Sequence, residues 1–599
     1  MKTSRPTCNL TQHKPLTLLL LLLLMLPSAA LAQFTYQTNN GAITITGYVC
    51  SGYEIIIPET INGLPVTDIG DGAFAGCTRL IIVTIGNNVT NIGSSAFSGC
   101  AGLTSITIPD SVSGVRDHAF DACTSLVDLT VGNSVTLIGD YAFNKCSGLT
   151  NIAIPDGVTK IGPAAFSFCN GLTRVTLGNG LTNIANSLFY GCTNLTSVTI
   201  GNSVTRISSW SFYGCFRLPG LNIPNSVTAI DYQAFRYSGL THITTPSSVT
   251  SIGEQAFQYC YSLTNADLNN GQIGSSAFDN CSNLISISMH NGQIGNSAFA
   301  NCGNLVSISM QNSVTSIGEG AFSYCTSLTN VTIPTSINSV GAYAFSHCTN
   351  LTTITVDPLN GLYNSVDGVL LNKSRTALII TPEGKIGSYM IPESVTILGV
   401  GALSGCTKLT SVTMPEDLLS IGADAFGRCV NLTNVTIPNR VTTLGDGAFG
   451  ACSGLTTITI PRSVTSIGVY AFSSCDTLTG IYFQGTPPNA GFLGVTPATA
   501  YYLPGPGWGP TFAGLPTAPW VLPYPVIGEP TPSRNLQSSP FGFIISWATN
   551  ASVVVDASPD LVNPAWSPLR TNTLANGWSY FSDSQWASYP SRFYRVRSL

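Results

Sequence analysis

A repeat of 23 residues is the feature that most constrains this sequence. Phenylalanines recur at that interval from Phe74 to Phe212, and each is followed three positions later by a cysteine, beginning with Cys77. The pattern loosens at Phe235 and then continues, with interruptions, as far as Phe472. A repeat of about this length predicts a solenoid, in which each unit buries its apolar face only against its neighbours.

Each repeat unit divides into three predicted parts. "LTNVTI" (Leu328–Ile333) alternates apolar and polar residues, which is typical of a half-buried strand. "SVTSIG" (Ser313–Gly318) is a second, shorter extended piece. "GAFSYC" (Gly320–Cys325) is predicted to form one helical turn, with its alanine, phenylalanine and cysteine facing inward. The expected fold class is a curved solenoid, mainly β, with short helical turns.

The N-terminus is predicted to be a signal peptide. Basic residues precede the apolar run "LTLLLLLLLML" (Leu16–Leu26), and "ALA" (Ala30–Ala32) offers small residues for cleavage. The protein is therefore expected to be exported, to the cell surface or beyond. No second long apolar run follows, so no integral membrane span is expected after cleavage. The net charge of −5 gives no basic surface, which argues against a nucleic-acid partner.

The cysteines allow two interpretations. Neighbouring turns of a stacked sheet lie ~4.8 Å apart, which is close enough for disulfides, and export to an oxidising compartment favours them. In-register stacking, however, makes the side chains parallel, whereas a disulfide needs a crossed geometry. Of the 18 cysteines, Cys8 lies in the signal peptide, so an odd number remains and at least one is unpaired. We favour buried thiols, with a disulfide ladder as the alternative.

The full repeat phrase, F-x-x-C-x-x-L-x-x-[IV]-x-I-P-x-S-V-T-x-I-G-x-x-A-F, resembles the BspA-like leucine-rich repeats, also called the Treponema pallidum type. This resemblance implies a leucine-rich-repeat solenoid that acts as a surface or secreted binding protein, since relatives include adhesins. It also implies an opening cap, a hairpin insertion within the array and a run-out at its end.

The tail is predicted to be a separate module. Prolines crowd the segment from Thr486 to Ser533, and its last stretch, from about Val526, is predicted to be an extended linker. "FGFIISWAT" (Phe541–Thr549) and later strand-like runs indicate a small antiparallel β-module. The predicted organisation is signal peptide 1–32, N-terminal cap 33–73, repeats of about 23 residues 74–356, hairpin insertion 357–392, repeats 393–480, run-out 481–525, proline-rich linker 526–540 and β-module 541–599.

No catalytic constellation is visible. The sequence lacks a nucleophile elbow, a P-loop, a dinucleotide fingerprint and a metalloprotease helix. A carbohydrate-active enzyme needs paired carboxylates, and no obvious pair is present. The histidines are isolated in sequence, and His347 is expected to be solvated. We predict no enzyme activity, no catalytic or metal-binding residues and no cofactor.

Two surfaces remain as candidates for binding. Outward positions of the strands, such as Asn330 and Thr332, form polar columns, which either suit exposed strands or offer a hydroxyl face to a ligand. A cluster of aromatic residues in the middle of the array is the second candidate, because aromatic side chains concentrate at interface hot spots. The alternative is that these rings only pack on one another along the edge. The cluster consists of Phe168, Tyr190, Trp210, Tyr213, Phe216, Tyr237, Tyr259 and Tyr261.

The predicted function is that of an exported, adhesin-like binding protein that recognises an extracellular protein or glycan through the solenoid surface. One alternative is a structural scaffold tethered by its C-terminal module. Another is an ice- or crystal-surface binder that uses the threonine columns. Nothing in the sequence identifies the ligand or the oligomeric state.

Overall fold

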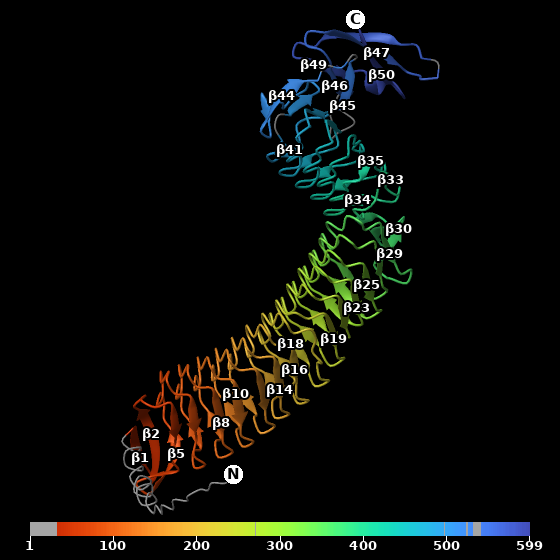
Figure 1. Ribbon diagram of the computed structural model, residues 1–599. Helices are drawn as coiled ribbons and strands as arrows, with labels where there is room; N and C mark the ends of the chain where they lie inside the picture. Colours follow the sequence, from red (N-terminus) through yellow and green to blue (C-terminus); the bar gives the residue numbers. More distant parts are fainter. Residues whose placement is uncertain are drawn as a thin grey trace, which may run out of the picture. The chain divides into compact units, whose positions relative to one another are not determined.

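The computed structural model describes residues 33–269, 271–495, 498–520, 522, 525–530, 541–562 and 564–599 (Figure 1). The predicted signal peptide and the second part of the predicted linker, 531–540, lie outside the described residues. The chain forms two compact units, Met1–Leu284 and Ile285–Leu599. The boundary between them falls within the repeat array.

The array is a β-solenoid of about 20 turns, so the predicted fold class is confirmed. Each turn contributes a strand to one parallel face and a shorter extended piece to a second face. The register is that of stacked identical turns: Val175 of β14 pairs with Val198 of β16, one repeat later. The burial of these strands alternates, with Val175 buried and Arg174 and Thr176 exposed, as the period of two in the sequence predicts.

In the first unit, the antiparallel pair β1 (Phe34–Asn39) and β2 (Ala42–Tyr48), with β4 (Thr60–Ile61), opens the fold. The strands of the first face are β3 (Glu54–Ile56), β6 (Ile82–Thr84), β8 (Ser105–Ile108), β10 (Asp128–Val131), β12 (Asn151–Ile154), β14 (Arg174–Leu177), β16 (Ser197–Thr199), β19 (His242–Thr245) and β21 (Asn265–Leu268). Those of the second face are β5 (Leu64–Ile69), β7 (Asn91–Ile92), β9 (Gly114–Val115), β11 (Leu137–Ile138), β13 (Lys160–Ile161), β15 (Asn183–Ile184), β17 (Arg206–Ile207), β18 (Ala229–Ile230), β20 (Ser251–Ile252) and β22 (Gln272–Ile273).

In the second unit, the strands of the first face are β23 (Ser286–Met289), β25 (Ser307–Met310), β27 (Asn330–Ile333), β29 (Thr353–Val356), β33 (Gly387–Met390), β35 (Leu409–Thr413), β38 (Thr457–Ile460), β40 (Gly480–Phe483), β42 (Thr499–Tyr502) and β44 (Leu515–Pro519), with β43 (Thr511–Phe512) pairing on β44. The second face has β24 (Gly292–Ile294), β26 (Val314–Ile317), β28 (Ser339–Val340), β32 (Ala377–Ile380), β34 (Ile397–Leu398), β36 (Ser420–Ile421), β37 (Thr443–Leu444), β39 (Ser466–Ile467) and β41 (Asn489–Ala490).

The segment expected to be a helical turn forms consecutive tight turns instead. Within one turn of the solenoid, the Cys100 N–H donates to Phe97 O over 3.1 Å, while the Phe97 N–H donates to Ala119 O of the next turn over 2.7 Å. The residue before each cysteine is left-handed, as at Ala122 with φ 57°. Because donors alternate between their own turn and the next one, a continuous i→i+4 helical ladder does not develop. The only helix in the described parts is 3₁₀ helix η1 (Trp586–Ser588).

The phenylalanines form the predicted interior column. From Phe74 to Phe278, successive rings lie with their centroids 4.8–6.1 Å apart. The rings of the first eight members, Phe74 to Phe235, are fully buried. Burial of a large apolar side chain is worth roughly 1.5–3 kcal/mol, so each turn gains stability from its column phenylalanine.

Most of the cysteines are buried thiols, as favoured from the sequence. All fifteen cysteines of the described residues that are not in a disulfide bond are buried. A typical thiol, Cys169, donates to the carbonyl of Phe143 in the preceding turn over 3.2 Å. Burial raises the pKa of the Cys100 thiol to about 12, which keeps it protonated and able to donate.

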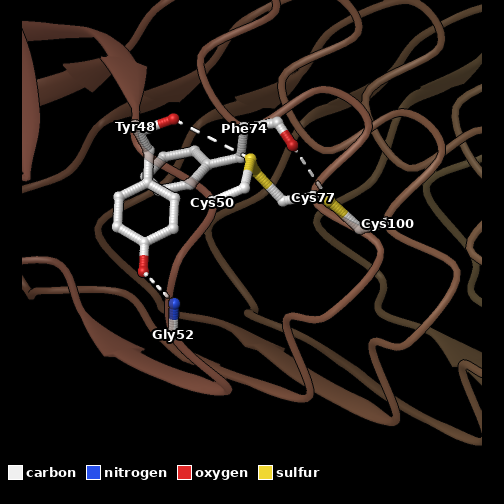
Figure 2. The surroundings of a disulfide bond; sticks show 6 residues. All are labelled: Tyr48, Cys50, Gly52, Phe74, Cys77 and Cys100. Carbon is white, nitrogen blue, oxygen red and sulfur yellow. Dashed lines mark hydrogen bonds between the residues drawn. A yellow bond between two sulfur atoms is a disulfide. The ribbon is translucent and has the colours of Figure 1, made fainter.

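One disulfide breaks this pattern, and the sequence did not reveal it. Cys50 of the N-terminal cap is bonded to Cys77 of the first repeat, with their Cα atoms 5.1 Å apart (Figure 2). The next cysteine, Cys100, donates to Phe74 O over 3.1 Å. Cys77 has no preceding repeat of the same kind, and Cys50 of the cap is its partner instead.

The region predicted as the hairpin insertion interrupts the column in the second unit. Strands β30 (Tyr363–Val366) and β31 (Val369–Asn372) form an antiparallel hairpin, and β31 pairs with β32. The following turn is shortened, and Thr381 takes the place of the phenylalanine. Its N–H donates to Ala402 O over 2.7 Å, as a column phenylalanine does, and its carbonyl accepts from Cys406 Sγ at 3.7 Å.

The C-terminal module consists of two three-stranded antiparallel sheets, which confirms the predicted β-module. The first sheet contains β45 (Val526–Pro530), β46 (Phe541–Ser546) and β49 (Trp578–Asp583), and the second contains β48 (Ser567–Thr573), β47 (Ser552–Ser558) and β50 (Phe593–Ser598). Residues 526–530 were expected to be linker but form β45, because an edge strand tolerates Pro530. Asp556, only 1% exposed, accepts from Arg595 and Arg597 at 2.9 Å each.

Candidate functional site

Six of the eight aromatic residues singled out in the sequence form one continuous row on the first unit. We call them the aromatic row: Phe168, Tyr190, Tyr213, Tyr237, Tyr259 and Tyr261. They come from five consecutive turns. The centroid distances between successive rings are 5.3, 4.7, 5.5, 4.8 and 5.9 Å, alternating between edge-on and stacked contacts up to Tyr259 and ending on a tilted one.

The backbone of the tight turns fixes where these rings lie. Phe168, Tyr237 and Tyr259 occupy the left-handed position before the cysteine site, with φ of 56–60°. Phe168 N–H donates to Tyr190 O of the next turn over 2.7 Å, so the ring bases are held in a hydrogen-bonded ladder. A Cβ at Gly191 would lie 2.8 Å from the Phe168 ring, so glycine there leaves room for that ring.

One cation belongs to the row and was not predicted. The Arg236 guanidinium lies 5.1 Å from the Tyr237 centroid and 5.2 Å from the Tyr259 centroid. Each contact is worth roughly 0.5–1 kcal/mol at an exposed site. The sequence did offer a signal for this contact, because Arg236 directly precedes Tyr237 of the predicted cluster.

The rings are partly available to a partner. Tyr261 is 50% exposed and Phe168 43% exposed, at the two ends of the row. Burial raises the pKa of the Tyr213 hydroxyl, so that hydroxyl stays neutral and can donate or accept a hydrogen bond. The row therefore combines apolar faces with phenolic hydroxyls, the composition that interface hot spots favour.

Among the described residues, the other two predicted residues make no ring contact with the row. Trp210 packs edge-on against Tyr232 at 5.4 Å, and its Nε1–H donates to Gln233 Oε1 over 2.9 Å. Phe216 is 59% exposed, and within the described residues no ring contact joins it to the row.

The expected polar columns are present on the strands of the first face. In β27, Asn330 and Thr332 are exposed while Val331 and Ile333 are buried. The same alternation holds in β12 and β14. The exposed positions of these three strands carry Asn, Thr, Ala and Arg side chains, so hydroxyl groups occupy only part of this face.

His347 is not the solvated side chain expected from the sequence. Its ring stacks on Tyr324 at 3.9 Å, and its Nε2 accepts from Arg428 NH1 at 2.6 Å. Partial burial and the nearby Arg428 lower the pKa of His347, so it is neutral. The shortened turn brings these residues together across 81 positions of sequence, which no local pattern indicates.

Buried Glu383 lies beside this histidine. Its Oε1 accepts the His347 N–H at 2.6 Å, and burial raises the pKa of its carboxyl group. In regular turns the equivalent N–H binds a carbonyl, as Tyr324 N–H binds Ser346 O at 2.8 Å. Glu383 therefore replaces a missing backbone acceptor. Searched across the described residues, the chain has no group of three or more His, Cys, Asp or Glu arranged to hold a metal ion.

The stacked turns and their exposed surfaces define the class of protein as a leucine-rich-repeat β-solenoid. A family model described as "BspA type Leucine rich repeat region (6 copies)" matches residues 48–173, 136–264, 182–293, 250–366 and 383–489. The chain belongs to this BspA-type leucine-rich repeat family.

Several solved structures are similar to this chain. A leucine-rich repeat protein from Bacteroides ovatus is 24% identical over 75% of this chain and 93% of its own, with a TM-score of 0.46. The T. pallidum leucine-rich repeat protein is 37% identical over 31% of this chain and 89% of its own, with a TM-score of 0.30. A leucine-rich cell surface protein from Faecalibacterium prausnitzii is 27% identical over 75% and 86%, with a TM-score of 0.26. No curated protein matches the chain.

The described residues contain no helix that is long and apolar enough to be a candidate membrane span.

Proposed function

We propose that this is an exported, non-enzymatic protein that binds an extracellular macromolecule through the aromatic row. The observation that carries the proposal is the continuity of that row over five turns, with Arg236 held against two of its rings. A protein surface is the favoured partner, because an extended strip of rings offers many modest contacts rather than one deep pocket.

Two further observations support export. The N-terminal sequence has the three regions of a signal peptide. The Cys50–Cys77 disulfide fits an oxidising compartment, since such bonds are rare where thiols are kept reduced. Membership of the BspA-type family is consistent with a repeat protein that acts by binding.

The double variant Tyr213→Ser/Tyr259→Ser tests the proposal. Mature protein is applied to an array of extracellular-matrix proteins and glycans, and bound partners are then measured by calorimetry. We expect the double variant to lose at least tenfold in affinity, because both substitutions remove stacked rings from the centre of the row.

The matched control is Tyr141→Ser. Tyr141 lies in the same unit and also stacks on a neighbouring ring, that of His118 at 5.0 Å, but it is outside the row. It should leave binding within twofold. A folded double variant that binds as tightly as the wild type would contradict the proposal.

A further inference from the structure

A cavity of about 470 Å³ lies in the second unit, where the last turns of the array meet the C-terminal module. It is separate from the aromatic row and is lined from several elements: the loops after β38 and β40, the segment after β42, and strands β45 and β46. The lining side chains that matter for recognition are Arg462, Gln484, Thr486, Trp508 and Trp520. The volume is within the range of small-ligand sites, about 300–1,000 Å³.

The walls of this cavity are held by contacts of their own. Trp508 stacks on Tyr502 at 5.0 Å with the rings 10° from parallel, and its Nε1–H donates to Gly485 O at 3.3 Å. On the module side, Trp547 Nε1–H donates to Leu522 O at 2.8 Å. The Ser546 hydroxyl donates to Pro504 O. The site is therefore formed before any ligand binds, which reduces the entropic cost of binding.

Aromatic rings lead from the exposed strand face towards the cavity. The outward threonine column ends at Thr459, whose strand neighbours are Tyr482 and then Tyr501. These two tyrosines stack at 4.8 Å, and Tyr482 lies 5.0 Å from Trp520, which lines the cavity. Polar side chains thus give way to three neighbouring rings at the end of the array.

We propose that this cavity binds one sugar unit of a glycan chain, with Tyr482 and Tyr501 supporting the units beside it. A sugar ring has an apolar C–H face, which packs on indole and phenol rings, and an edge of hydroxyls, which need hydrogen-bond partners. Gln484 and Thr486 supply donors and acceptors, and Arg462 supplies donors.

Charge is scarce among the described lining residues. Arg462 is the one charged side chain there, and it already has a partner of its own. Recognition at this site therefore depends on the rings and the hydrogen-bonding groups and not on net charge.

Calorimetric titration of the mature full-length chain tests the inference. The probes are laminarin, xylan and polygalacturonate. We expect at least one to bind, Trp520→Ala to weaken that binding at least tenfold, and Gln484→Ala to weaken it severalfold. Trp210→Ala, which removes an exposed tryptophan from the other unit, is the matched control and should change affinity less than twofold.

The inference is overturned if none of the three polysaccharides binds, or if folded Trp520→Ala binds as the wild type does. It is also overturned if a synthetic proline-rich peptide binds in a Trp520-dependent way while the polysaccharides do not. Should Trp520→Ala fail to fold, Gln484→Ala decides, since Gln484 is exposed. The Tyr213→Ser/Tyr259→Ser variant should keep polysaccharide binding, which separates this site from the aromatic row.

Discussion

A regular turn and the interrupted turn of the second unit solve the same packing problem differently. At the regular turn, Phe322 fills the column between Phe299 and Phe345, with ring centroids 5.4 and 5.5 Å away. At the interrupted turn, Thr381 occupies the column position and a cavity of about 230 Å³ opens beside it. The solenoid therefore tolerates the loss of a ring where another group accepts the backbone N–H bonds that link successive turns.

The ladder is completed by a side chain. Tyr324 N–H binds the carbonyl of Ser346, whereas His347 N–H binds the carboxylate of Glu383. A buried N–H without an acceptor costs roughly 1–3 kcal/mol. The buried carboxylate is therefore tolerated because it satisfies a donor that the shortened turn would otherwise leave unpaired.

The largest expected effect is the loss of a ring from a regular turn. Phe322→Ala should lower the free energy of unfolding by about 3–5 kcal/mol, because a fully buried ring leaves a cavity between two stacked neighbours. Urea unfolding of the mature chain measures this. Leu403→Ala, at the column position of the turn that follows Thr381, should lower the free energy of unfolding by less, because a smaller side chain is removed; an equal or larger loss at Leu403 would remove the distinction between the two turns.

The next effect concerns the start of the array, where Cys77 lacks the carbonyl partner of later cysteines. Cys50→Ser/Cys77→Ser should lower the free energy of unfolding by about 3.5 kcal/mol, which is the loop-entropy estimate for the 27-residue separation of the two cysteines. Hydrogen exchange should show faster exchange in β1 and β2. The single variant Cys169→Ser, which keeps a hydroxyl donor to Phe143 O, is the control and should leave those strands unchanged.

A smaller effect is expected at Glu383. Glu383→Ala should lower the free energy of unfolding by about 1–3 kcal/mol, because the His347 N–H loses its acceptor. Glu383→Gln keeps an acceptor oxygen and should cost less. Thermal melting of both variants measures the difference, and equal losses would mean that the hydrogen bond is not what Glu383 contributes.

The same residue predicts a pH dependence. Burial raises the pKa of Glu383 in the folded chain above its ordinary value of 4.5. Between pH 4.5 and the folded-state pKa of Glu383, the folded state binds more protons than the unfolded state. The stability that comes from protonated Glu383 is therefore present below pH 4.5 and is lost as the pH rises through the folded-state pKa. The wild type should lose this contribution over that window relative to Glu383→Gln. Parallel pH profiles would contradict the assignment.

The smallest effect is a gain. Thr381 Oγ1 is buried, and within the described residues it has no hydrogen-bond partner. Thr381→Val replaces the hydroxyl by a methyl group of similar size and should stabilise the protein by about 1 kcal/mol. Chemical denaturation measures this change. A loss of stability would show that the hydroxyl has a partner in the cavity, and Ser404→Ala, which changes another residue lining that cavity, is the comparison.

Two stacked pairs of the aromatic row could be predicted from the sequence, because stacked turns place residues of equal phase side by side. Tyr190 and Tyr213 share a phase and stack, as the repeat requires. Trp210 is at a different phase and lies with Tyr232 instead. Arg236 was missed because composition does not show which side chains lie over a ring.

The cavity near Trp508 and Trp520 could not be predicted from the sequence. Its walls come from the run-out and from β45 and β46, which follow a segment of irregular composition. No repeat period relates those residues, so their proximity depends on how the module packs.

By itself, the sequence determined the solenoid, its two faces and its interior columns, because a fixed period fixes which residues become neighbours when turns stack. Only the tertiary structure decided the Cys50–Cys77 bond, the Glu383 acceptor and the cavity at the end of the array. Each of these lies where the period fails. There, contacts depend on the path of the chain through space, which no local spacing specifies.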